Sequence, residues 1–343
     1  MRSIEFSVSA LFLGCFVVPA LLLADSAKAG QPIRIVSYNC EILAAPGERV
    51  TISKYRFDKA RRLQFERIAA VIESMDADIV NLQEVTSKES VDLLVKILHE
   101  KGMTDYRGYH VDGHDNFMKL DVACISKFEP DEVEGALIRC IWSSAEDDTW
   151  RETFTFARDD QSIGSSSSSI DRNALYYFTI GQTKLGILGL HLKSNPDDAY
   201  ANGRRTAEAE VARRIVQKEI VARGYTPIIV GDLNDYDPDV PDQDEHRSTK
   251  TEVLRSLKDY DEKHDGDELV NAAKKITRQA DRYTSHWDRN ENRADDFYDV
   301  KTMLDHILLH KSLMPGVKRV FINHAPSLET SDHFPVVVDL EIP

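Results

Sequence analysis

Cysteine is scarce in this chain, and the few cysteines present have no regular spacing. Four occur among 343 residues. Cys15 falls in an N-terminal stretch that we expect to be removed, which leaves Cys40, Cys124 and Cys140. An odd number of cysteines at irregular intervals does not form a disulfide framework. Cys124 lies inside an apolar run, where a cysteine usually behaves as a small core residue.

Basic residues are also in deficit. The chain has 43 Lys and Arg against 58 Asp and Glu, which gives a formal net charge of −15. Broad nonspecific nucleic-acid binding draws on an excess of Lys and Arg, so this charge argues against it. A nuclease is still compatible, because an enzyme that holds one scissile phosphate through a metal and a few local donors needs no basic surface. The charge therefore bears on which substrate to expect, and it does not decide between classes of reaction.

Long apolar runs are absent from the sequence except near its start. Arg2 supplies a positive charge, residues 10–24 are mostly apolar, and Ala27 and Ala29 are small residues at the two positions that a signal peptidase reads. We therefore predict a signal peptide over residues 1–29, with cleavage before Gly30 and export to the periplasm or the medium. No later run is long enough for a stable membrane span.

Two other interpretations of the N-terminal stretch are possible. A membrane anchor is disfavoured because the apolar run is shorter than the ~20 residues that a span needs. A lipoprotein signal cleaved at Cys15 is disfavoured because residues 17–24 would remain as an exposed apolar tail.

The rest of the sequence alternates between strand and helix patterns and has no repeat of fixed period, which disfavours a solenoid or propeller. Residues 58–75 and 206–222 have apolar side chains at helical spacing. The alternation predicts an α/β fold, and the absence of a long linker predicts one catalytic domain over residues 30–343. Eight short runs predict buried strands: 33–38, 79–82, 122–126, 174–180, 185–190, 227–231, 304–309 and 335–340.

Two polar segments are expected to be loops. The serine-rich residues 165–169 predict a flexible loop. Residues 235–245 are acidic and contain proline, but they lack the central glycine and terminal glutamate spacing of an EF-hand. We expect them to form a solvated loop rather than a calcium site.

Polar residues stand at the ends of several predicted strands, where open α/β folds place their ligands. Asn39 and Glu84 end two of these strands, and His191 interrupts a third. Asp232 and Asn234 follow a fourth strand, and their spacing of two points both side chains to one face if strand geometry continues. Each residue alone has an ordinary structural interpretation as a turn residue, a helix-start acid or a packed histidine.

A second group of polar residues flanks the last predicted strands. Asp332 and His333 precede the final strand, where a carboxylate beside an imidazole suits a metal ligand next to a proton-transfer group. Asp305 opens an apolar run and could be either a capping acid or the carboxylate that orients His333. His306 should face the other way, and we expect it to be structural.

This ordered set resembles the endonuclease/exonuclease/phosphatase superfamily, in its deoxyribonuclease I-like branch. The resemblance spans roughly residues 33–343 and implies two packed β-sheets flanked by helices, a four-layer sandwich with the site at one end. The motifs that carry the resemblance are Asn39, Gln83-Glu84, His191-Leu192-Lys193-Ser194, Gly231-Asp232-Leu233-Asn234, Leu304-Asp305-His306 and Ser331-Asp332-His333-Phe334-Pro335.

The resemblance implies a metal site and a role for each residue in it. Glu84 would be the principal ligand of Mg²⁺, with Asn39 and Asp332 completing or bordering its shell. An oxygen-rich site of this kind suits Mg²⁺ or Mn²⁺ better than zinc, which favours His or Cys.

The same resemblance implies the catalytic roles. Asp232 would position the attacking water, and Asn234 would donate to the phosphoryl oxygen. His333, held by Asp305, would act as base or as a phosphate-binding imidazolium, while His191 would contact the phosphate or assist the leaving group. The division of acid and base roles between the two histidines stays open.

Four further positions extend the candidate site. Arg172 sits where relatives place a phosphate-contacting arginine, and Lys193 is a second candidate phosphate contact. Glu41 falls where abasic endonucleases have an acidic neighbour of the metal. Asp121 could support His191, as in the deoxyribonucleases.

The expected activity is hydrolysis of phosphodiester bonds, with nucleic acid, DNA or RNA, as the favoured substrate. His191 points toward deoxyribonucleases and sphingomyelinases, and Ile229 and Tyr236 replace the tryptophan and arginine of inositol-polyphosphate 5-phosphatases. The alternatives are a phospholipid phosphodiesterase or phosphomonoesterase of the same superfamily, and an exported binding protein that has lost catalysis. Every identified site position is filled, which disfavours the last.

The export hypothesis predicts the N-terminus of the mature protein. Sequencing by Edman degradation or mass spectrometry should find a chain that begins at or near Gly30, because the residues before it carry the features of a cleaved signal. Intact Met1 on active protein from the cytoplasm would contradict the hypothesis.

Overall fold

The computed structural model describes residues 30–50, 59–144, 146–244, 250–261, 263–264, 266–292 and 295–342. The predicted signal peptide, residues 1–29, lies outside the described residues. Within the described part, no helix is both long enough and apolar enough to cross a membrane.

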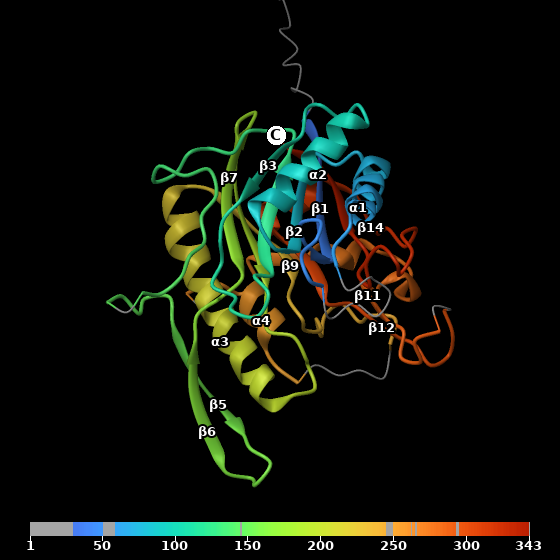
Figure 1. Cartoon of the computed structure of the whole chain (residues 1–343). Coiled ribbons are helices and arrows are strands. Elements are labelled where there is room, and N and C mark those ends of the chain that lie inside the picture. Colours follow the sequence, from blue (N-terminus) through green and yellow to red (C-terminus); the bar gives the residue numbers. More distant parts are fainter. Residues whose placement is uncertain are drawn as a thin grey trace, which may run out of the picture.

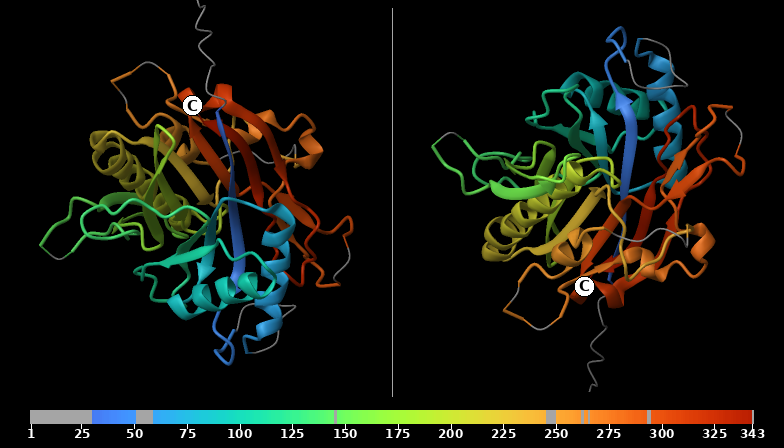
Figure 2. Two further views of the ribbon diagram at one scale, coloured as in Figure 1. Left: turned by 90° about the horizontal axis from the view of Figure 1, so that it is seen from above. Right: turned by 90° about the horizontal axis from the view of Figure 1, so that it is seen from below.

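Two β-sheets form the centre of the molecule (Figures 1 and 2). The order of the first sheet is β14 (Val317–Ile322), β15 (Val336–Ile342), β1 (Gln31–Leu43), β2 (Ile79–Val85), β4 (Asp121–Ser126) and β3 (Arg107–His110). The order of the second is β10 (Leu269–Asn271), β13 (Asp305–His310), β9 (Thr226–Asp232), β8 (Thr183–His191) and β7 (Asn173–Ile180). All eight predicted strands are confirmed.

Helices cover the outer faces of both sheets. On the first sheet lie α1 (Arg62–Met75) and α2 (Lys88–Glu100), and on the second lie α3 (Ala199–Ile215) and α4 (Val253–Lys258). A π-helical turn (Val216–Ile220) and a 3-10 turn (Val221–Arg223) continue α3. Further 3-10 turns are Ala272–Lys275, Gln279–Asp281 and Lys311–Gly316. The predicted four-layer α/β sandwich is confirmed.

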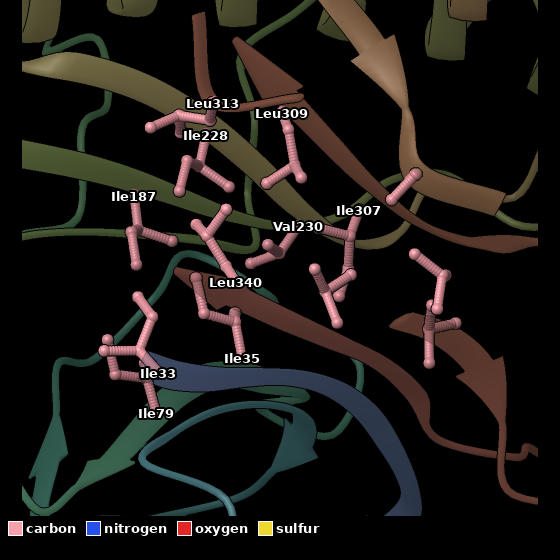
Figure 3. Close-up of a cluster of buried hydrophobic side chains, with 14 of the residues drawn as sticks. Ile33, Ile35, Ile79, Ile187, Ile228, Val230, Ile307, Leu309, Leu313 and Leu340 are labelled. Carbon is pink, nitrogen blue, oxygen red and sulfur yellow. The ribbon is translucent and has the colours of Figure 1, made fainter. Parts of the chain in front are cut away.

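The alternation of apolar residues along the strands explains this layering. In β1, Ile33 and Ile35 point into the core between the sheets, whereas Val36 and Tyr38 pack beneath α1 and α2. Figure 3 shows the core between the sheets, where Ile33 and Ile35 meet side chains of the second sheet such as Val230. Successive residues of a strand face opposite sides of the sheet, so a strand with apolar residues at both odd and even positions can be buried on both faces. This pattern fits the place of β1 in the interior of its sheet.

The serine-rich segment is not the flexible loop that its composition predicts. Ile163–Ser168 forms β6, paired antiparallel with β5 (Glu152–Ala157), and the two strands extend from the body of the protein (Figure 1). Backbone hydrogen bonds make this ladder without help from the serine side chains. Phe154 and Phe156 make edge-to-face contacts with Tyr200 of α3 and anchor the hairpin.

The acidic segment after β9 is irregular as predicted, but several of its acids are buried rather than solvated. Asp235 pairs with fully buried Arg205 at 2.8 Å, and Asp237 accepts a 2.8 Å hydrogen bond from Lys258. The prediction was wrong because these cations come from α3 and α4, whose proximity is not visible in the local sequence. Burial of a carboxylate is tolerable when such a partner is present.

Gly231 determines how β9 delivers Asp232 to the end of the sheet. Its φ is +140°, and a Cβ at this position would lie 1.9 Å from the carbonyl oxygen of Leu190.

We expect Gly231→Ala to lower the free energy of unfolding by about 3 kcal/mol or more, measured by denaturant titration. The control Gly224→Ala also has positive φ, but no heavy atom lies within 4 Å of its added Cβ. It should lose only about 1 kcal/mol, and equal losses would show that the contact with Leu190 is unimportant.

Candidate active site

Strand pairing brings the predicted polar residues to one end of the sandwich. Within the second sheet, Asp232 is the register partner of His191 on one side and of Asp305 on the other. Asn39 is paired with Gln83 in the first sheet, one residue before Glu84. The two sheets meet there, because the side-chain amide of Asn39 donates to the carboxylate of Asp232 at 3.1 Å.

Glu84 is held at an irregularity in the strands. The ladders of β2 shift register beside it, and its own φ is +62°, a left-handed value that is rare for a residue with a side chain. Its carboxylate accepts hydrogen bonds from the backbone of Ile42 at 3.0 Å and from Asn39 Nδ2 at 3.2 Å. Burial, followed by repulsion from Asp332, raises the pKa of Glu84.

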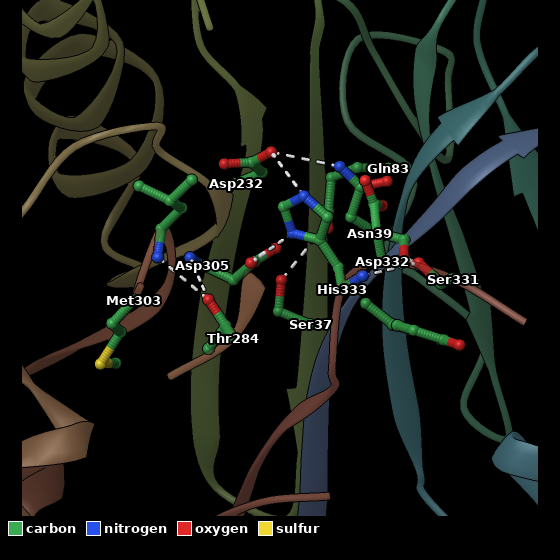
Figure 4. A network of polar contacts seen from close by, with 12 residues as sticks. Ser37, Asn39, Gln83, Asp232, Thr284, Met303, Asp305, Ser331, Asp332 and His333 are labelled. Atoms are coloured by element: carbon green, nitrogen blue, oxygen red, sulfur yellow. Dashed lines mark hydrogen bonds and ion pairs between the residues drawn. The ribbon is translucent and has the colours of Figure 1, made fainter. Parts of the chain in front are cut away.

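Asp232 lies at the centre of the site (Figure 4). Its Oδ1 accepts a 3.0 Å hydrogen bond from the backbone of Asn234, and its Oδ2 accepts the hydrogen bond from Asn39. Burial, with the nearby charge of Asp305, raises the pKa of Asp232 to about 7. A carboxyl with a pKa near neutrality can take up or release a proton under physiological conditions.

His333 and Asp305 form a buried pair. Nδ1 of His333 donates to Oδ2 of Asp305 at 2.7 Å, and Nε2 lies 4.0 Å from Oδ2 of Asp232 (Figure 4). Burial opposes protonation of His333, but the charge and hydrogen bond of Asp305, with Asp232 and Asp332, raise its pKa well above the ordinary value. The predicted orienting contact of Asp305 with His333 is therefore present.

Ser331 fixes the position of the Asp332–His333 segment. Its hydroxyl donates to the backbone carbonyl of Asn39 at 2.8 Å and accepts a hydrogen bond from the backbone N–H of His333 at 3.0 Å. The backbone N–H of Asp332 donates to the Glu41 carboxylate at 3.1 Å, which brings Glu41 to the edge of the cluster. Two hydrogen bonds, one to Asn39 and one to Glu41, therefore attach the segment to β1.

His191 has an environment opposite to that of His333. Its Nε2 lies 3.8 Å from both Glu84 and Asp232, and 3.4 Å from a guanidinium nitrogen of Arg172. Burial, then the positive charges of Arg172 and His333, lower the pKa of His191 well below the ordinary value. The two environments therefore favour the protonated form of His333 and the neutral form of His191, an arrangement typical of acid and base groups with separate roles.

A cavity of about 660 Å³ opens onto these residues. Arg172 and Lys193 line it, and burial, followed by the charges of Arg172 and Arg204, lowers the pKa of Lys193. Asn234 also lines it, with its side-chain amide donating to the carbonyl of Leu192 at 3.2 Å. The structure thus brings the predicted phosphate contacts to the same cavity as the catalytic cluster.

Sequence reasoning missed several residues that line the cavity. Phe117 and Trp287 are 70% and 48% exposed, and His286 and Arg204 also line the wall. Phe117 and Trp287 lie in segments without helical or strand periodicity, so no pattern marked them. Only Trp287 carried a signal, since a large aromatic residue in a polar segment of sequence often has a binding role.

Two individual predictions have different outcomes. Asp121 does not contact His191 through any hydrogen bond or ion pair in the described part of the chain. Its partners are instead the backbone N–H of Gly113 and the ring of His110, because β3 and β4 bring those residues closer. His306 is buried and bonds to Asn271 and to the carbonyl of Asp235, which confirms its structural role.

The donor atoms of this site suit a hard divalent cation. Glu84, Asp232 and Asp332 all face the cavity, and burial together with neighbouring acids raises the pKa of Glu84 and of Asp232. A cation would relieve the repulsion between neighbouring acids, and carboxylate oxygens are the ligands that Mg²⁺ and Mn²⁺ prefer. Asn39 Oδ1 accepts from the backbone of Glu41 at 2.9 Å, so Asn39 borders the carboxylates.

Several solved structures share this architecture, among them an AP endonuclease and TDP2. An endonuclease/exonuclease/phosphatase family protein from Leptotrichia buccalis is 15% identical, with a TM-score of 0.55 over 90% of this chain and 100% of that chain. An AP endonuclease from Archaeoglobus fulgidus is 16% identical, with the same TM-score and coverage. Truncated TDP2 from Caenorhabditis elegans is 15% identical, with a TM-score of 0.51 over 90% and 98% of the two chains.

A family model gives the sequence-level assignment. No curated protein matches the sequence. The model of the endonuclease/exonuclease/phosphatase family matches residues 36–333, which include every residue of the candidate site from Asn39 to His333. The members of this family are phosphoesterases and nucleases that depend on divalent metals. The chain described here belongs to the endonuclease/exonuclease/phosphatase family.

Proposed function

We propose that this protein is an exported phosphodiesterase that uses Mg²⁺ or Mn²⁺ to cleave nucleic acid. The observation that carries the proposal is the buried cluster around Asp232. Asp305 holds His333 on one side of it, and His191, whose pKa is lowered by burial, lies on the other. Opposed histidines beside a carboxyl of pKa about 7 supply the groups that phosphodiester hydrolysis needs.

Each group of the cluster has a proposed task. Asp232 would hold and deprotonate the attacking water, and Asn234 would donate its second amide N–H to a phosphoryl oxygen. His333 would bind the phosphate as an imidazolium, and neutral His191 would act near the leaving group. Glu84, bordered by Asn39 and Asp332, would hold the divalent cation, which polarises the phosphoryl oxygen and offsets its charge.

Features around the cavity support a nucleic-acid substrate. Arg172, Lys193 and Arg204 line the cavity and offer cationic contacts for phosphate oxygens, although acidic residues outnumber them in its walls. The exposed rings of Phe117 and Trp287 offer surfaces on which bases can stack. TDP2 from Danio rerio, which has the same architecture at a TM-score of 0.50 and 15% identity, was solved with a single-strand DNA product.

A substrate panel tests the proposed function. Purified mature protein with Mg²⁺ or Mn²⁺ should cleave DNA or RNA faster than sphingomyelin or small phosphate esters, with activity that falls as salt rises. Arg172→Ala and Lys193→Ala should raise KM more than they lower stability. Faster hydrolysis of sphingomyelin would contradict the nucleic-acid substrate but keep the assignment as a phosphodiesterase. Faster hydrolysis of a monoester would contradict the phosphodiesterase assignment itself.

The contact between His333 and Asp305 predicts non-additive effects on rate. His333→Ala should lower kcat by at least about a hundredfold, and Asp305→Ala should add little in the double variant, because groups that act as a unit are not additive. The exposed pair His264–Asp261 has a similar 2.8 Å contact, so His264→Ala is a matched control that should keep full activity. Fully additive losses would assign Asp305 a separate structural task.

The proposed role of Glu84 predicts a change in metal dependence. Glu84→Gln keeps the shape of the side chain but removes its charge, so it should need a higher Mg²⁺ concentration for half-maximal rate and react more slowly. Chelation should abolish wild-type activity, and added Mg²⁺ or Mn²⁺ should restore it. An unchanged metal requirement in Glu84→Gln would show that another residue is the principal ligand.

A further inference from the structure

A second cluster of possible metal ligands lies outside the catalytic cavity. His110 ends β3, Asp121 begins β4, and Asp112 lies in the loop between the two strands. One donor atom from each residue lies within 4.8 Å of the other two. None of the three residues lines the catalytic cavity, and the proposed function uses none of them.

The two buried members of this cluster converge without forming a hydrogen bond. The side chains of His110 and Asp121 are only 3% and 2% exposed. Nε2 of His110 lies 3.2 Å from Oδ2 of Asp121, yet neither atom has a hydrogen-bond partner among the residues that the structure describes. Leaving two such atoms buried and unsatisfied costs free energy, so their arrangement calls for a further partner.

A similar cluster elsewhere shows the contrast. His286, Asp295 and Asp299 also place donor atoms within 4.8 Å of one another. There, however, His286 Nε2 makes a 2.7 Å hydrogen bond with Asp299 Oδ2, and that oxygen also accepts from the backbone of Asp296 at 3.1 Å. The two atoms that make that contact are satisfied by protein, although Oδ1 of Asp299 is buried without a hydrogen-bond partner in the described part of the chain. The pair His110–Asp121 lacks this satisfaction.

We propose that His110, Asp121 and Asp112 bind a divalent transition-metal ion, of which Zn²⁺ fits best. Ligands at 2.0–2.1 Å from a tetrahedral zinc ion are about 3.3 Å apart, close to the separation of His110 Nε2 and Asp121 Oδ2. An imidazole nitrogen suits Zn²⁺ better than Mg²⁺ or Ca²⁺. Asp112 is exposed and supplies the third ligand, and water takes the fourth position.

The ion would hold the loop that forms one wall of the catalytic cavity. Asp121 already accepts a 3.0 Å hydrogen bond from the backbone of Gly113 through its other oxygen. The next residue, His114, donates its backbone N–H to the carbonyl of Asp171 at 2.7 Å, directly before Arg172. Farther along the same loop, Phe117 lines the cavity. Zinc at this site is therefore structural and orders a substrate-binding wall.

Measurement of the zinc content of the purified protein tests the proposal independently of activity. The protein is stripped with chelator, equilibrated with a large excess of Mg²⁺ to occupy the oxygen-rich site, and then dialysed against micromolar Zn²⁺. Wild-type protein should retain one zinc per chain and gain thermal stability. Asp121→Asn and Asp112→Asn should each weaken zinc affinity by at least about tenfold, because each removes a charged ligand.

The controls separate this site from other sources of zinc. His264→Ala, which removes an exposed histidine, should retain the zinc. Because Asp112 is exposed, Asp112→Asn should fold normally even if the buried variant does not. Failure of wild-type protein to retain zinc, or equal retention by Asp112→Asn and Asp121→Asn, would overturn the proposal and leave an ordinary buried ion pair. Zinc loss in these variants with a raised KM, but with an unchanged requirement for Mg²⁺ or Mn²⁺, would support it and leave the proposed function intact.

Discussion

The arrangement of the site depends on the contacts that the buried carboxylate of Asp232 makes with both sheets. Asp232 lies between two strand neighbours in one sheet and is joined to the other sheet through the amide of Asn39. A buried charge without partners would cost several kcal/mol, and here the surrounding groups share that cost. The positions of His191 and His333 follow, since each lies within about 4 Å of this carboxylate.

The backbone around this carboxylate adopts unusual conformations. Glu41, Ile42, Glu84 and Asn234 all have positive φ, and all lie at the end of the sandwich where the cavity opens. Such conformations persist only where the surrounding structure enforces them, and they cluster at functional sites. Here the hydrogen bond from the backbone N–H of Ile42 to the Glu84 side chain joins two of these residues directly.

Much of the fold and the composition of the cluster could be predicted from sequence, because both depend on local patterns. Eight apolar runs gave eight strands, and polar residues at their ends mark where the strands leave the core. What local pattern could not supply was distance between segments. Arg205 pairs with Asp235 because α3 packs beside the loop after β9, and Asp121 meets His110 rather than His191 because β3 pairs with β4. The prediction of a loop at residues 165–169 was wrong for a related reason. Residues 165–168 belong to a strand because they pair with β5, which lies earlier in the chain.

The catalytic cluster is divided between the two sheets, and this division makes it sensitive to their alignment. Glu84 and His333 belong to the first sheet and its loops, whereas His191 and Asp305 belong to the second. The packed isoleucines and valines between the sheets therefore act as a spacer that sets the distance across the site. A loosening of that apolar layer too small to unfold the protein would still separate the two halves of the chemistry, so selection for rate also constrains residues far from the cavity.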